Sequence, residues 1–142
     1  MFAGLSIVGT GAAAGQTVLH SPQAIAACLC LDDGVGQART EMQRARDAYE
    51  AARARVEQLT QQTVQERARV NSDDPVSVDS YKDLLARRDA AERDFANKAT
   101  PTYAAAIARY NDAVGSYNAR CEGKSFDADI LASVRQSLVC PR

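Results

Sequence analysis

The 142-residue chain is poor in large side chains: aromatic residues make up only 6% of it, and tryptophan is missing. Alanine, which is abundant, favours helix but buries little area when it enters a core. An excess of one charge is also missing, because 17 Lys and Arg stand against 18 Asp and Glu. The chain therefore lacks the strongly basic field that nucleic acid selects, and we expect no nucleic-acid partner. Its thin core needs long helix contacts, covalent staples or a protein partner.

The residue sets that carry catalysis are also missing. His20 is the single histidine, and the sequence contains no Gly-rich phosphate loop, Ser-His-Asp set or paired acid and base. The acidic residues around residues 73–83 lack the spacing of a calcium loop, and turn formation accounts for them better. We therefore predict that the protein is not an enzyme and that it uses no cofactor or metal.

The N-terminal stretch is uncharged as far as Asp32. Its small and apolar residues are followed by Pro22 and by an Ala-Ile-Ala triplet that ends at Ala26, which is typical of a signal-peptidase site. We predict a signal peptide over residues 1–26 that is cleaved after Ala26, with cleavage after Ala14 as the alternative. The basic start that such signals usually carry is missing. The repeated glycines of this segment, together with His20 and Pro22, make a membrane-spanning helix there unfavourable. We expect no transmembrane span in the mature form.

Export changes the interpretation of the cysteines, because an even number of them in an oxidising compartment indicates disulfides. The chain has four cysteines, namely Cys28, Cys30, Cys121 and Cys140. We predict two disulfides, and among the possible pairings we favour Cys30–Cys121 with Cys28–Cys140. A bridge that closes about 90 residues stabilises a fold by roughly 4–5 kcal/mol in the chain-entropy description.

Other roles for Cys28 and Cys30 stay open. A four-cysteine zinc site usually has C-x₂-C pairs, whereas Cys121 and Cys140 lie far apart in the sequence. A redox pair lacks a neighbouring cation that would lower a thiol pKa. Residues 25–28 resemble a bacterial lipobox, which predicts a lipid anchor on Cys28. We do not favour acylation, because it would leave one of the other three cysteines unpaired.

Apolar and small residues recur at steps of three and four from residue 35 to residue 70. This spacing predicts a helix over about residues 35–70 with a coiled-coil-like seam, in which larger residues alternate with alanines. The seam consists of Val35, Ala38, Met42, Ala45, Tyr49, Ala52, Val56, Leu59, Thr63, Glu66 and Val70.

Turn-forming residues and Pro75 predict a turn over residues 71–76, because proline cannot continue the first helix. A second helix over about residues 77–119 follows, with Ser77 or Asp79 available as its N-cap. Its seam consists of Tyr81, Leu84 or Leu85, Arg88, Ala91, Phe95, Ala99, Tyr103, Ile107, Tyr110, Val114 and Tyr117.

The second seam has two irregular features. From Phe95 the spacing runs four and four before alternation returns, which predicts a kink or a break near Pro101. Arg88 is the one charged residue on this seam, and we expect it to meet Glu57 or Glu66 of the first helix.

Tyr103, Tyr110 and Tyr117 follow one another at seven-residue steps. They could form an aromatic strip that binds a partner. We favour a role in the seam, with the hydroxyl groups reaching its rim.

Two long helices joined by a short turn lie antiparallel. With the turn centred near residues 73–74, the numbers of facing residues should sum to about 147. Continued outward, this register brings the segment that contains Cys28 and Cys30 to a position opposite residues 117–121. The register is independent of the cysteine count, and it still brings cysteines together.

Beyond the second helix, Gly123 is a stop signal and Asp127 a cap for a short helix over about residues 127–139. This helix should fold back over the open end of the hairpin and bring Cys140 to the remaining N-terminal thiol. The predicted fold is therefore all-α: residues 27–142 form one domain, a long antiparallel hairpin with a short C-terminal helix stapled to its open end.

These features predict a non-catalytic exported protein, periplasmic or secreted in a bacterium. We expect an accessory subunit or scaffold of the cell envelope, whose protein partner is a second copy or a larger envelope complex. One alternative is a holdase-type chaperone that grips clients between helical arms. A second alternative is a metal or redox carrier that uses the four thiols.

Overall fold

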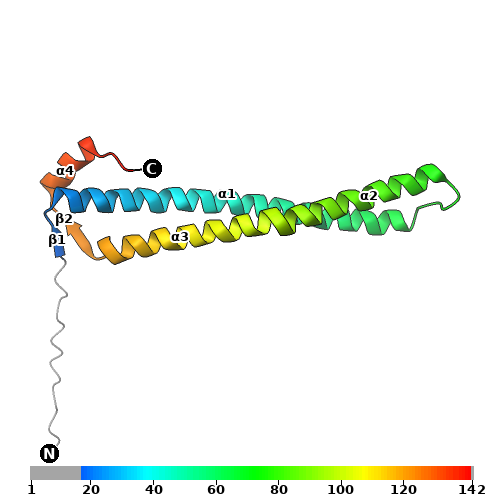
Figure 1. The fold of residues 1–142 in the computed structure, drawn as a ribbon, viewed down its shortest axis with the longest axis horizontal. Helices are drawn as coiled ribbons and strands as arrows, with labels where there is room; N and C mark the ends of the chain where they lie inside the picture. The colour runs from blue at the N-terminus through cyan, green and yellow to red at the C-terminus, as the bar shows by residue number, and fades with distance from the viewer. Residues whose placement is uncertain (1–16, 142) are drawn as a thin grey trace, which may run out of the picture.

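Two helical arms lie side by side along most of the molecule in the computed structural model, which describes residues 17–141 (Figure 1). The first arm is the 46-residue helix α1 (Pro22–Arg67). The second arm consists of α2 (Pro75–Asp94), the π-helical turn η1 (Phe95–Ala99) and α3 (Thr100–Cys121). The arms run antiparallel, and in Figure 1 the second arm crosses from one side of α1 to the other along its length. The predicted all-α helical hairpin is confirmed.

Helix α1 begins at Pro22 rather than near residue 35. Ser21 is its N-cap, with the side-chain oxygen accepting a hydrogen bond from the Ala24 backbone N–H at 3.3 Å. Proline suits the first helical position because it has no N–H to lose there. Gly34 and Gly36 lie inside the helix, and no other part of the protein lies within 4 Å of the place where a side chain would begin. Two glycines cost a helix roughly 1 kcal/mol each relative to alanine, so neighbouring contacts must offset them.

The turn between the arms lies where the sequence predicts it, but its caps differ. Asp74 is the N-cap of α2, with its carboxylate accepting a backbone N–H two residues on at 3.1 Å, and Pro75 takes the first helical position. Ser77 accepts the backbone N–H of Asn71 at 3.0 Å instead of capping the helix. The predicted caps, Ser77 and Asp79, are therefore wrong, because α2 starts earlier than the spacing of the seam suggested.

The predicted disturbance near Pro101 is confirmed, and it takes the form of the π-helical turn rather than a break. The backbone N–H of Thr100 bonds to the carbonyl of Phe95, five residues back, and the Thr100 hydroxyl donates to the same oxygen at 2.9 Å. Pro101 has no N–H, and its ring collides with the carbonyl four residues earlier in a regular helix. A widened turn immediately before it removes that collision and keeps the arm continuous.

The two predicted seams form the contact between the arms. Every seam residue except Glu66 is buried or half-buried. The fully buried positions are few, however, because the contact is only one layer of side chains deep. The buried apolar residues are Ile25, Cys28, Leu59, Leu84, Ala106, Cys121 and Val134.

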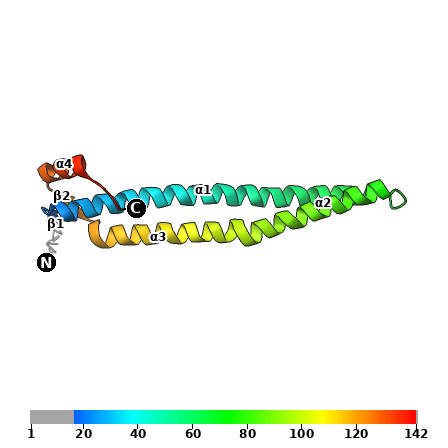
Figure 2. The same ribbon diagram turned by 45° about the horizontal axis from the view of Figure 1, so that its top comes forward.

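The open end of the hairpin carries three short elements that form its base (Figures 1 and 2). Strand β1 (Thr17–Leu19) pairs in parallel with strand β2 (Lys124–Phe126), and helix α4 (Ala128–Ser137) follows. Gly123 ends α3 with φ at +69°, a conformation that glycine adopts without steric cost. Asp127 caps α4, as predicted. Both strands were missing from the prediction.

Replacing Leu59, which is 1% exposed, by alanine tests how strongly the thin seam holds the arms. We expect Leu59→Ala to lower the free energy of unfolding by about 2–4 kcal/mol, because it leaves a hole between α1 and α2. Chemical denaturation with the disulfides intact measures this loss. Val64→Ala is the control on the same helix: Val64 is 67% exposed, and its loss should change stability by at most about 0.5 kcal/mol. Equal losses in the two variants would contradict a seam centred on Leu59.

Candidate functional site

The four cysteines form two disulfides at the base, Cys28–Cys121 and Cys30–Cys140. Their Cα atoms lie 5.7 Å and 5.3 Å apart, within the usual range for a disulfide. The prediction that all four cysteines pair is confirmed. The pairing that we favoured, Cys30–Cys121 with Cys28–Cys140, is wrong.

The direction of the side chains on α1 explains the observed pairing. Cys28 and Cys30 both lie inside the helix, so their side chains point about 200° apart around its axis. Cys28 faces α3 and Cys30 faces the segment after α4. The register agrees, because the residue numbers of Cys28 and Cys121 come closer to the expected sum of about 147 than those of Cys30 and Cys121 do. The favoured pairing overlooked this difference because it left residues 28–30 outside the helix.

Two contacts further along the arms have the same register. The Arg39 guanidinium lies 6.0 Å from the centre of the Tyr110 ring, and these two residue numbers have the same sum as those of Cys28 and Cys121. Arg109 and Glu41 form an ion pair at 3.5 Å, and the sum of their residue numbers is larger by only one. One alignment of the arms therefore extends from the base at least to this ion pair.

Tyr103, Tyr110 and Tyr117 are half-buried on the seam side of α3. The Tyr103 ring lies 5.4 Å from the Tyr49 ring across the interface, at a tilted angle that aromatic pairs favour. These contacts support the role in the seam that we favoured. Binding of a partner by the tyrosine strip stays a prediction.

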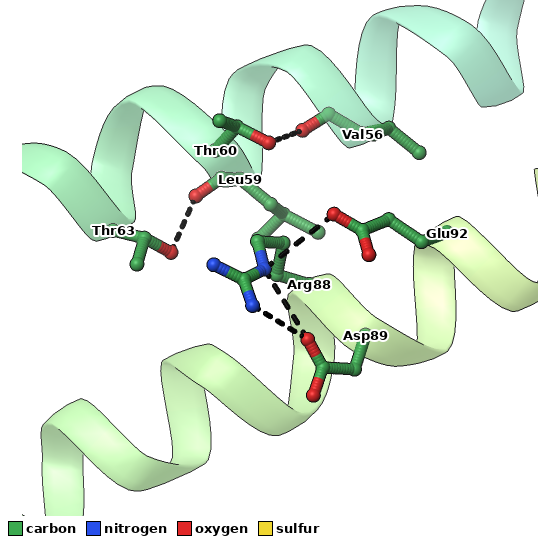
Figure 3. A network of polar contacts seen from close by, with 7 residues as sticks. All are labelled: Val56, Leu59, Thr60, Thr63, Arg88, Asp89 and Glu92. Atoms are coloured by element: carbon green, nitrogen blue, oxygen red, sulfur yellow. Dashed lines mark hydrogen bonds and ion pairs between the residues drawn. The ribbon is translucent and has the colours of Figure 1, made fainter.

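Arg88, the charged residue on the second seam, forms its ion pairs within its own helix and not with the other arm. Its guanidinium reaches toward Leu59, but it bonds to Asp89 at 2.8 Å and pairs with Glu92 at 3.5 Å, both on its own helix (Figure 3). The expected ion pair with a glutamate of α1 is therefore wrong. The buried hydroxyl of Thr63 donates to the carbonyl of Leu59 at 2.8 Å, so it needs no partner across the interface.

Asp127 joins the strands to α4. Its backbone N–H donates to the carbonyl of Leu19 at 3.1 Å, and its carboxylate accepts the backbone N–H groups of Asp129 and Ile130 at 3.1 Å and 3.2 Å. The second carboxylate oxygen lies 3.4 Å from Nδ1 of His20. The N–H of Ile130, helped by His20, holds the pKa of Asp127 below its usual range.

A shallow groove follows one side of the hairpin where α1 meets α2, η1 and α3. It consists of two adjoining hollows of about 330 and 260 Å³ that share Ala52 and Asp94. Charged side chains, including Asp94 and Lys98, border it. Small side chains let another helix approach closely, because they set the distance between helix axes. The alanines that line the groove are Ala45, Ala48, Ala52, Ala90, Ala91 and Ala99.

All four cysteine sulfurs are bonded in disulfides, so none is present as a thiolate. Within residues 17–141, no cluster of three or more histidine, cysteine, aspartate or glutamate side chains is arranged to hold a metal ion. Over the same residues, no helix combines the length and hydrophobicity that a membrane crossing requires.

Comparison of the chain with known protein families, with curated proteins and with solved structures finds no match.

The lowered pKa of Asp127 predicts how the base responds to acid. Folding favours the ionised carboxylate, so its contribution to stability is complete above the unfolded pKa of about 3.9 and is lost as the pH falls through the lower, folded pKa. Amide hydrogen exchange in α4, corrected for its intrinsic pH dependence, should therefore lose protection in this acidic range.

Asp127→Asn is the matched control, because asparagine caps helices well but does not titrate. Its α4 should show a smaller acid-induced loss of protection than the native chain. Asp127→Ala removes the cap and should speed exchange roughly five-fold at neutral pH. Identical acid profiles for the native chain and Asp127→Asn would rule out this role of the carboxylate.

Proposed function

We propose that the chain is an exported, non-catalytic interaction protein of the bacterial cell envelope, acting as an accessory subunit or scaffold. The observation that carries this proposal is that the disulfides of the chain are all at one end of the hairpin. Both disulfides, both strands and α4 lie at one end of the hairpin, while the arms continue without such support (Figures 1 and 2). From Cys28 to Arg67 the first arm extends about 60 Å at 1.5 Å per residue. A stapled base with a projecting arm suits a protein that presents a helical surface to a partner.

The two disulfides support an oxidising location, for which we propose the periplasm or the extracellular space. They also weigh against a lipid anchor on Cys28. Acylation needs the Cys28 sulfur, which is bonded to Cys121 and is part of the core, since Cys28 is 4% exposed.

The structure supports a different processing site from the one that we favoured. Cleavage after Ala26 would cut α1 in its second turn and remove β1. It would also remove Ile25, which is completely buried. The alternative site after Ala14 lies outside the described residues, and a cut there would leave every described element in place. We therefore propose processing after Ala14.

The intact mass of the protein recovered from the periplasm of an expressing bacterium tests export, processing and oxidation together. We expect the mass of a chain that begins at Gly15, lower by four hydrogens than the mass measured after reduction. A chain that begins at Ala27 would contradict the processing site. Recovery of the protein with free thiols in the cytoplasm would contradict the proposed location.

The partner surface that we propose is the alanine-lined groove. Its length and small side chains suit a helix or helix pair, from a second copy or from another envelope protein. The proposal is consistent with the thin seam, since a partner in the groove would cover Ala52 and Ala91, which the two arms leave half-buried.

A photo-crosslinking residue at Ala48, introduced in the cell envelope, tests the groove. We expect a discrete crosslinked product from Ala48, which lines the groove, and at least about tenfold less from Ala54, an exposed alanine of the same helix that does not line it. The mass of the product distinguishes a second copy from another protein. Equal yields at the two positions would contradict the groove as the partner surface.

A chaperone role has one supporting observation. Val64 and Val76 are 67% and 73% exposed near the free end of the hairpin, where apolar client segments could bind. The same crosslinker at Val76 should then give a heterogeneous set of products. Products confined to Ala48 would leave the scaffold role as the better proposal.

A further inference from the structure

The two disulfides differ in how far they are accessible to solvent. Cys28 and Cys121 are 4% and 2% exposed, and their bond lies between α1 and α3. Cys30 and Cys140 are only half-buried. A thiolate must reach a disulfide sulfur before it can exchange with it. The more exposed bond, Cys30–Cys140, should therefore react faster than Cys28–Cys121.

The segment that contains Cys140 is fixed mainly by its disulfide. Cys140 follows α4 in an extended stretch, and its neighbour Val139 is 87% exposed. Next to it lies an open hollow of about 300 Å³, lined by Pro22 and Ala26 of α1 and by Val134 of α4. Pro22 and Val139, which also lines this hollow, are exposed to solvent.

The long-range connection between the arms does not depend on this second bond. While the bond Cys28–Cys121 is closed, the bond Cys30–Cys140 closes only one small additional loop. This loop consists of residues 121–140 and residues 28–30. Opening it leaves α1 and α3 joined at the base. Its structural effect is therefore confined to the segment that follows Gly123.

We propose that Cys30–Cys140 is a thiol–disulfide exchange site whose substrate is a dithiol reductant of the envelope, and that Cys28–Cys121 is a permanent structural bond. A thiolate of the reductant attacks Sγ of Cys140, forms a mixed disulfide and releases Cys30 as the leaving thiolate, which takes up a proton. The second thiol of the reductant then attacks its own sulfur in the mixed disulfide and releases Cys140. Two electrons and two protons pass to this chain, and the reductant leaves as a disulfide.

Reduction frees the C-terminal segment from α1. The contacts left to hold α4 include the three-residue strand pair, the contacts of Asp127 with Leu19 and His20, and the packing of Val134. Departure of α4 would expose Ala26 and the neighbouring apolar surface of α1. The exchange site thereby controls an apolar surface at the base, separate from the groove along the arms.

Differential alkylation of the native, oxidised protein tests the proposal. The protein is exposed to dithiothreitol at increasing concentration without denaturant, quenched with iodoacetamide and analysed by mass spectrometry after digestion. We expect carbamidomethyl groups on Cys30 and Cys140 at least about tenfold faster than on Cys28 and Cys121. A reduced thioredoxin-fold protein, used at equal thiol concentration, should give the same order. Equal rates, or faster labelling of Cys28 and Cys121, would overturn the proposal.

A matched pair of double variants separates exchange from general unfolding. Cys30→Ser with Cys140→Ser should lose the fast alkylation phase, keep the helical circular dichroism of the native protein and exchange amide hydrogen faster only over residues 127–140. Cys28→Ser with Cys121→Ser should retain the fast phase. Unchanged exchange in α4 after removal of Cys30–Cys140 would refute its release. If the second variant does not fold, the alkylation order in the native chain still decides the question.

Discussion

The bond between Cys28 and Cys121 is the constraint on which the rest of the structure depends. It joins residues 93 apart in sequence at the open end of a hairpin whose core is one side chain deep. In the chain-entropy description such a bond contributes roughly 4–5 kcal/mol, which is comparable with the whole net stability of many small domains, about 5–15 kcal/mol. It also fixes the register. A seam that alternates alanine with larger residues penalises a slip between the arms only weakly, because alanine layers resemble one another, whereas the covalent bond forbids the slip.

The parts of the fold that depend on local chemistry could be predicted from the sequence. The three-and-four spacing identified the residues that face the other arm, because an amphipathic helix displays its buried side at that period. Pro75 identified the turn, and the stutter after Phe95 identified the place of a disturbance that proves to be a π-helical turn, since both features act within one or two helical turns. Glu66 is the exception on α1: it lies one residue before the end of the helix, where the seam gives way to the turn.

The parts that depend on distant contacts could not be predicted. Strands β1 and β2 are three residues each and pair Thr17 with Lys124, far apart in the sequence, so neither strand has a recognisable sequence pattern of its own. Gly34 and Gly36 lower helix propensity, and the helix passes through them because residues 28–30 are attached to α3 and to the C-terminal segment and because the seam continues on both sides of the glycines. The disulfide pairing failed for the same reason. It requires knowing that both cysteines are helical and therefore point in different directions.

The spacing of Cys28 and Cys30 explains how one short segment of helix supports the whole base. Side chains two residues apart on an α-helix point in directions about 200° apart around its axis. The two disulfides therefore attach nearly opposite sides of α1 to two separate elements. The same arrangement makes an alanine-rich surface tolerable. Alanine weakens the contact between the arms and at the same time opens the groove beside it. Because the base is held by disulfides, the chain retains its fold without filling that groove with its own large side chains.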